Sequence, residues 1–127
     1  MSIKVIYTDK APAAVGPYSQ AIMAGSVLYS SGQLGLIPET GLLSEGIAAQ
    51  TVQSLKNVES VLEEAGFRKE DVVKTTVFLT DLGNFGIVNK LYADFFGETK
   101  PARSCVEVSA LPKGGLVEIE FTAVKNS

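Results

Sequence analysis

Histidine and tryptophan are absent from these 127 residues, and cysteine occurs once, at Cys105. Without histidine the chain lacks the base that activates the nucleophile in Ser-His and Cys-His enzymes. Zinc sites built from cysteine and histidine are excluded as well, and we expect no metal site. One cysteine cannot close an internal disulfide, which is typical of a reducing compartment.

Other signatures are missing too. The sequence has no G-x-G-x-x-G fingerprint and no P-loop, and we expect no cofactor. It has no apolar run long enough to span a membrane, and MSIKVIYTDK at the start lacks the apolar core of a signal peptide, so we expect a cytoplasmic protein. The eleven Lys and Arg against fourteen Asp and Glu form no basic run, which argues against nucleic acid as a partner.

The residues that are present favour a compact fold. Hydrophobic residues make up 46% of the chain and charged residues 20%, which predicts one domain over residues 1–127 with a well-filled core. The apolar excess leaves room for an interface between subunits.

Hydrophobic periodicity predicts an α+β domain. Strand patterns lie at 3–7, 18–24, 27–33, 71–79, 102–108 and 117–124, and helical patterns lie at 44–66 and 84–96. Both helices are expected on one face of a single sheet, so the other face meets solvent or a partner subunit. The short loop between the last two strands predicts that they are antiparallel neighbours.

The longer helix is expected to begin after an N-cap at Ser44 and to end near Gly66. Its predicted buried face contains Ala48 and Val52 and continues toward the C-terminus, whereas Asn57 is expected on the opposite, polar face.

Charged residues alternate with apolar ones on the last two strands. Glu118 and Glu120 share one face of 117–124, and Arg103, Cys105 and Glu107 share one face of 102–108. Because the helices need the apolar faces, we expect the charged faces to point the same way, toward the uncovered side of the sheet. Arg103 and Glu118 then form either an exposed ion pair or a site with a carboxylate-binding arginine beside an acid/base glutamate.

Cys105 has two readings. It is either a small, partly buried strand residue or a nucleophile whose thiolate Arg103 stabilises, and the missing base favours the first.

Smaller polar residues are further candidates. Tyr18 lies in GPYSQA, and Ser31 and Gly32 lie in YSSGQLG, where a glycine would let a ligand approach the backbone closely. Asn89 flanks the apolar face of the second helix. The alternatives for these residues are ordinary turn, strand-end and helix-flank positions.

Taken together, these stretches resemble one family. The motifs APAAVGPYSQA, YSSGQ, VVKTTVFLTDL, VNKLYADFF, KPARSCVEV and LPKGGLVEIE occur in this order between about Ala11 and Val124. The chain is thereby similar to the RidA family, also called YjgF, of reactive-intermediate imine deaminases.

The resemblance implies a chorismate-mutase-like domain, with a mixed sheet and two helices on one face, that forms homotrimers with active sites between subunits. It also implies a cofactor-independent hydrolysis. The substrates are 2-imino or enamine acids such as 2-iminobutanoate and 2-iminopropanoate, released by pyridoxal-phosphate enzymes, and the products are 2-oxo acids and ammonia.

The resemblance assigns roles to particular residues. Arg103 is similar to the family's anchor for the substrate carboxylate, and Glu118 to the residue that positions the water. The pocket-lining positions are Tyr18, Ser31, Gly32, Asn89 and Cys105. The proton for the leaving nitrogen comes from Tyr18 or from a water.

Two rival functions remain open at the level of sequence. One is RNA cleavage or inhibition of translation, as described for some relatives of the family. The other is a regulatory protein that binds 2-oxo or amino acids in the same pocket without turning them over.

Overall fold

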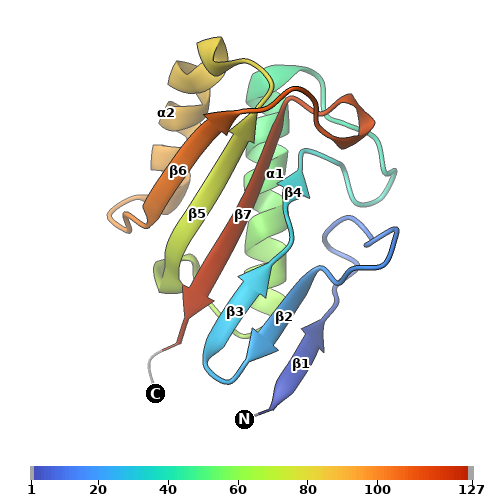
Figure 1. Ribbon diagram of the computed structural model, residues 1–127, viewed down its shortest axis with the longest axis vertical. Helices are drawn as coiled ribbons and strands as arrows, with labels where there is room; N and C mark the ends of the chain where they lie inside the picture. The colour runs from blue at the N-terminus through green and yellow to red at the C-terminus, as the bar shows by residue number, and fades with distance from the viewer. Residues whose placement is uncertain (1, 126–127) are drawn as a thin grey trace.

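The computed structural model describes residues 2–125, which form one layer of strands and one layer of helices (Figure 1). The strands are β1 (Ile3–Ile6), β2 (Ala21–Ala24), β3 (Val27–Ser30), β4 (Gln33–Leu34), β5 (Val72–Leu79), β6 (Ala102–Glu107) and β7 (Val117–Val124). The α-helices are α1 (Gly46–Glu64) and α2 (Phe85–Phe96), and short 3-10 helices lie at Lys69–Asp71, Leu82–Asn84 and Pro112–Gly114.

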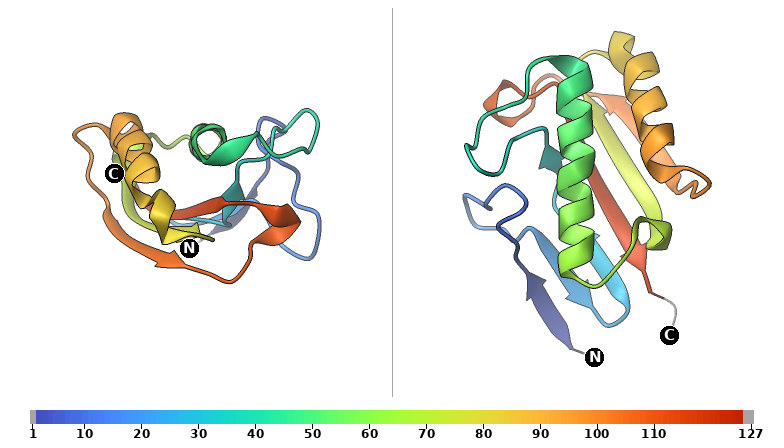
Figure 2. Two further views of the ribbon diagram at one scale, coloured as in Figure 1. Left: turned by 90° about the horizontal axis from the view of Figure 1, so that it is seen from above. Right: turned by 180° about the vertical axis from the view of Figure 1, so that it is seen from behind.

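The strands form a single mixed sheet in the order β1-β2-β3-β7-β5-β6, and β4 also pairs with β7. The β5–β6 pair is parallel, and the other pairs are antiparallel. Both helices lie on the same side of this sheet (Figure 2). The predicted mixed sheet with two helices on one face is therefore confirmed.

The core lies between the helices and one face of the sheet. Along β7, burial alternates from residue to residue, and Ile119 and Phe121 contribute to the core together with Val58 and Leu62 of α1. A strand that covers a core on one side alternates in this way because successive side chains point to opposite faces.

The prediction that the last two strands are neighbours is wrong, because β5 lies between β6 and β7. The chain leaves β5, forms α2 and returns as β6 parallel to β5. A strand–helix–strand connection of this kind brings two parallel strands side by side. The second edge of β5 is then free, and β7 pairs there.

The predicted common face for Arg103 and Glu118 is also wrong. Arg103 stands opposite Thr75 of β5, and Thr75 stands opposite Phe121 of β7, so Arg103 shares the helix-covered face with the core residue Phe121. By the same register, Cys105 and Glu107 also lie on the helix-covered face of the sheet. Glu118 and Glu120 lie on the uncovered face. Period 2 separates the two faces within a strand, but only the register between strands shows which faces coincide.

The helix α1 differs from its predicted form at its beginning. It starts at Gly46 after Glu45, without a side-chain cap, while the Ser44 N–H donates to the Gly35 carbonyl. Val52 is exposed and Asn57 is fully buried, which reverses both predictions. Part of the buried face of α1 is thus polar.

Candidate functional site

The predicted site residues other than Cys105 divide between two separate cavities. The first, here called the Glu118 pocket, has a volume of about 520 Å³ and includes Tyr18, Ser31, Gly32 and Glu118 in its lining. The second, here called the Arg103 pocket, has a volume of about 380 Å³ and lies at the end of α2. Its lining consists of Asn89, Tyr92, Ala93, Phe96, Gly97, Thr99, Lys100, Pro101 and Arg103.

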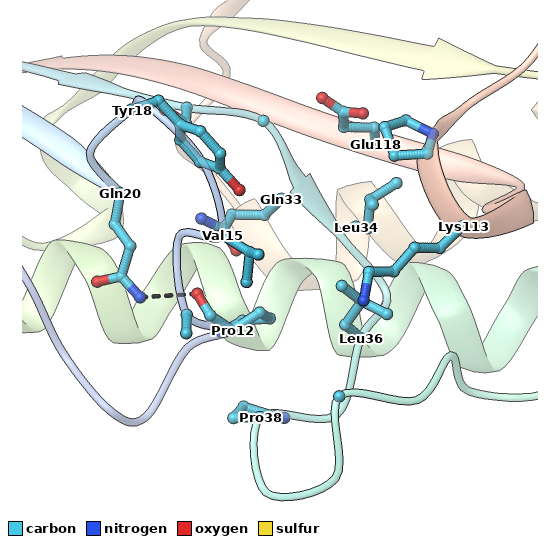
Figure 3. Close-up of a pocket in the computed structure, with 15 residues that line it drawn as sticks. Pro12, Val15, Tyr18, Gln20, Gln33, Leu34, Leu36, Pro38, Lys113 and Glu118 are labelled. Atoms are coloured by element: carbon cyan, nitrogen blue, oxygen red, sulfur yellow. Dashed lines mark hydrogen bonds between the residues drawn. The ribbon is translucent and has the colours of Figure 1, made fainter.

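The Glu118 pocket lies where β4, the loop after it and the loop before β2 approach one another (Figure 3). Tyr18 and Glu118 lie on the sheet side of the pocket, whereas Leu36 and Pro38 lie on the side of the loop that follows β4. Most of the wall is apolar, and Glu118 and Lys113 are the charged residues in the lining.

A β-bulge forms the back of this pocket. Tyr29 of β3 pairs with Thr122 of β7, and Gln33 of β4 pairs with Ile119 of β7. The pairing register with β7 therefore shifts by one residue between β3 and β4. Bulges of this kind bend a strand and redirect side chains, and they are frequent beside active sites. The predicted strand 27–33 is therefore two strands, separated by Ser31 and Gly32.

Gly32 is required by the position of Glu118. A Cβ atom placed on Gly32 would overlap the Glu118 carboxylate. The group that approaches Gly32 closely is a carboxylate of the chain itself, and the approach of a ligand to this glycine stays a prediction.

Hydrogen bonds of Gln20 hold the loop that contains Tyr18. Gln20 is buried; its Oε1 accepts from the Thr8 N–H at 2.7 Å, and its Nε2 donates to the Pro12 carbonyl at 2.8 Å. The Ser31 hydroxyl donates to the Ser19 carbonyl at 2.6 Å, which ties this loop to the bulge. The sequence reading missed Gln20, although it lies within the quoted GPYSQA stretch.

The environment of Glu118 changes its acidity. Partial burial raises the pKa of the Glu118 carboxyl above its ordinary value of 4.5, and the neighbouring Glu120 raises it further. A carboxylate with a raised pKa is a better proton acceptor, provided that it is ionised at the working pH.

Arg103 is held in place by α2. Its Nη1 donates to Asn89 Oδ1 at 2.8 Å, and its guanidinium carbon lies 4.8 Å from the Tyr92 ring centroid and 5.4 Å from that of Phe85. Such contacts fix the plane of a guanidinium by hydrogen bonding and cation–π attraction. The hydrogen bond to Asn89 uses one of the five N–H donors of the guanidinium, and the exposed side chain leaves others for an anion.

Cys105 lies two residues from Arg103 on the same face and lines neither cavity. Burial raises the pKa of the Cys105 thiol, and the Arg103 guanidinium offsets only part of that rise. A thiol with a raised pKa is mostly protonated at neutral pH and is a weak nucleophile.

Residues 2–125 contain neither a candidate metal site nor a candidate membrane-spanning helix. No group of three or more His, Cys, Asp or Glu side chains is close enough to hold a metal ion. No helix in that range combines the length and apolar composition needed to cross a membrane.

Comparison with known proteins gives consistent matches along almost the whole chain. A protein of Salmonella typhimurium named 2-iminobutanoate/2-iminopropanoate deaminase is 50% identical over 125 residues, which is 96% of this chain and 98% of that protein. The crystal structure of RidA from an Antarctic Psychrobacter matches with a TM-score of 0.94 and 50% identity, over 96% of this chain and 99% of that one.

A further structure, Escherichia coli TdcF with bound serine, matches with a TM-score of 0.94 and 42% identity over 97% of this chain and 99% of that one. The profile of the family described as Endoribonuclease L-PSP matches residues 8–125. The chain therefore belongs to this family, which is the YjgF/RidA family that its motifs resemble.

Proposed function

We propose that this protein is a cofactor-independent deaminase of 2-imino acids, with 2-iminobutanoate and 2-iminopropanoate as substrates. The observation that carries the proposal is an arginine already oriented by Asn89, Tyr92 and Phe85, with donors left for a carboxylate. The Salmonella typhimurium relative, which is 50% identical and is named for this activity, supports the proposal.

The proposed active site combines the two cavities from neighbouring subunits. Within one chain, Arg103 and Glu118 lie on opposite faces of the sheet. A head-to-tail ring joins two different surfaces of the same chain, so it can set the Arg103 pocket of one subunit against the Glu118 pocket of the next. We propose that the ring is a homotrimer, as the family resemblance implies.

The uncovered sheet face supports such an assembly. Val5, Tyr29 and Val106 lie on this face by register and are 61%, 52% and 41% exposed. Exposed apolar side chains gathered on one face are typical of a surface that a partner covers.

The proposed chemistry needs little beyond orientation. Arg103 binds the carboxylate of the 2-imino acid, and Glu118 accepts a proton from a water as that water attacks C2. As the water attacks, the imine nitrogen takes a proton from the Tyr18 hydroxyl or from a second water, which gives the amino alcohol. The protonated Glu118 then passes its proton to that nitrogen, and ammonia leaves. The C2 hydroxyl returns its proton to the Tyr18 oxygen or to the hydroxide, which leaves the 2-oxo acid. Ser31 and Gly32 contribute walls around the substrate, whereas Cys105, which the family resemblance suggested for this role, lines neither cavity.

The serine held by TdcF supports a ligand of this kind, because serine carries the α-carboxylate and nitrogen that a 2-imino acid also carries. Binding alone, without turnover, would fit a regulatory protein.

RNA cleavage, suggested by the family's description, has less support. The chain contains no histidine and carries a net charge of −3. Nucleic-acid binding depends on clustered positive charge, and the Glu118 pocket includes one lysine beside its glutamate.

The proposal is tested by adding the protein to a threonine dehydratase reaction and following the imine trapped by semicarbazide. Wild type should lower the trapped imine, and Arg103→Ala should reduce kcat/KM about 10- to 100-fold, as expected for losing a hydrogen bond to a charged group. Lys69→Ala is a matched control, because Lys69 also lies over an α2 ring, that of Phe95. Equal imine levels with and without wild-type protein would reject the proposal.

A further inference from the structure

One face of α1 buries a row of polar side chains. Gln50, Ser54 and Asn57 are spaced four and three residues apart, which sets them on one face of the helix, and they are 5%, 0% and 0% exposed. Burying polar groups is costly unless each has a hydrogen-bond partner. Their partners therefore indicate why the sequence keeps them there.

Two of these side chains bind the backbone that leads away from the bulge. The Ser54 hydroxyl donates to the Gln33 carbonyl at 2.7 Å. The Asn57 amide nitrogen donates to the Leu34 carbonyl at 3.0 Å and to the Leu36 carbonyl at 2.9 Å.

The other two contacts complete the arrangement. Gln50 Oε1 accepts from the Leu116 N–H at 2.9 Å, just before β7 begins. Gln53 Nε2 donates to Asn57 Oδ1 at 2.9 Å, which orients the Asn57 amide with its nitrogen toward the carbonyls. The row thus contacts both strands that carry the Glu118 pocket.

Carbonyl groups of β4 find hydrogen-bond partners on α1, which covers this face of the sheet. β4 pairs with β7 on one side, and among residues 2–125 no strand pairs with its other edge. Gly35 packs directly against α1, because a Cβ there would lie 2.5 Å from the Gln50 carbonyl oxygen. Side chains of α1 therefore satisfy carbonyls that a sheet would normally pair.

We propose that Ser54 and Asn57, together with Gln50, are positioning residues for catalysis. They hold β4 in place, and this fixes the position of the bulge at Ser31 and Gly32 relative to the Glu118 carboxylate. This inference rests on the proposed imine hydrolysis. It concerns the Glu118 pocket, where the attacking water is proposed to bind. Arg103 is oriented separately, by residues of α2.

The test compares Ser54→Ala with Thr51→Ala in the dehydratase assay. Thr51 is equally buried on the same helix, but its hydroxyl bonds to the Ile47 carbonyl within α1 and not to β4. Both variants should lose some thermal stability. Ser54→Ala should lower kcat about tenfold with KM within about twofold of wild type, because a displaced catalytic group costs rate more than binding. Thr51→Ala should keep both values.

A second measurement keeps this inference separate from the proposed function. Amide hydrogen exchange at Gly32 and Leu34, followed by NMR, should accelerate in Ser54→Ala and in Asn57→Ala but not in Thr51→Ala. If wild type hydrolyses no imine, the proposed function fails, and the exchange rates still decide whether the row holds β4. Equal exchange in all variants, or an unchanged kcat in a folded Ser54→Ala variant of active wild type, overturns the inference.

Discussion

At the scale of single residues, the motif PARSCVEV contains one residue prepared to bind and one that is not. Arg103 has a hydrogen-bond partner and two aromatic rings that hold its plane before any ligand is present. Cys105 has a raised thiol pKa and lines neither cavity. The structure thus favours the arginine as the working residue of this stretch and the thiol as its neighbour.

Glu118 connects activity with pH. Its folded-state pKa lies above the ordinary 4.5, so the carboxylate needed for catalysis is lost as pH falls through that raised value. We expect the acid limb of the pH–rate profile to lie above pH 4.5, and Glu118→Gln to abolish turnover. A titration of initial rate against pH measures the first, and a limb below 4.5 would contradict it.

The raised pKa of Glu118 also predicts an effect on the stability of the fold. Because ionising Glu118 is less favourable in the folded chain than in the unfolded chain, its charge opposes folding at neutral pH. Glu118→Gln should therefore raise the midpoint of thermal unfolding at pH 7. The gain should disappear below pH 4.5, where both states are protonated, as calorimetry at the two pH values can show.

At the scale of elements, α2 supplies the residues that hold the Arg103 side chain. The Tyr92 hydroxyl and Thr75 Oγ1 lie 2.7 Å apart, and both residues are buried, which joins α2 to strand β5. Tyr92→Phe keeps the ring under Arg103 but leaves the Thr75 hydroxyl without its partner. We expect a loss of about 1–3 kcal/mol in the free energy of unfolding with little change in KM, measured by urea denaturation and the imine assay. A raised KM with unchanged stability would contradict this.

The elements themselves were largely predictable from the sequence, because local periodicity is a property of neighbouring residues. Helix α2 at Phe85–Phe96 agrees with the predicted 84–96, and β7 has the predicted bounds. The buried Asn57 was not predictable, since its amide is satisfied by carbonyls more than twenty residues away. The break at Ser31 and Gly32 depends in the same way on pairing with a distant strand.

At the scale of the whole molecule, the candidate site was predictable in its residue types and not in its geometry. Arg103 and Glu118 were found from motif and alternation, but their faces depend on β5, which stands between their strands. A strand inserted between two others is invisible to any pattern within those two.

Because Arg103 and Glu118 lie on opposite faces of the sheet, mixing two variants tests whether neighbouring subunits share an active site. Subunits carrying Arg103→Ala should keep at most about a tenth of the wild-type kcat/KM, and subunits carrying Glu118→Gln should be inactive. When the two are unfolded together and refolded, about one quarter of the sites in a random ring should receive an intact arginine and an intact glutamate from different subunits. The recovered rate in the imine assay should approach that fraction of wild type. A mixture of Arg103→Ala with the double variant is the control, and rescue there, or none in the test mixture, would contradict shared sites.

The separation of Arg103 and Glu118 by the thickness of one sheet also has a consequence for kinetics. A chain that held both groups in one cavity would keep the same rate per molecule at any dilution. If the sites are shared between subunits as proposed, a dissociated monomer carries only separate halves of a site. The rate should then fall more steeply than in proportion to protein concentration once the ring dissociates. The apparent order of the reaction in protein would then rise above one, and it would report how firmly the subunits associate.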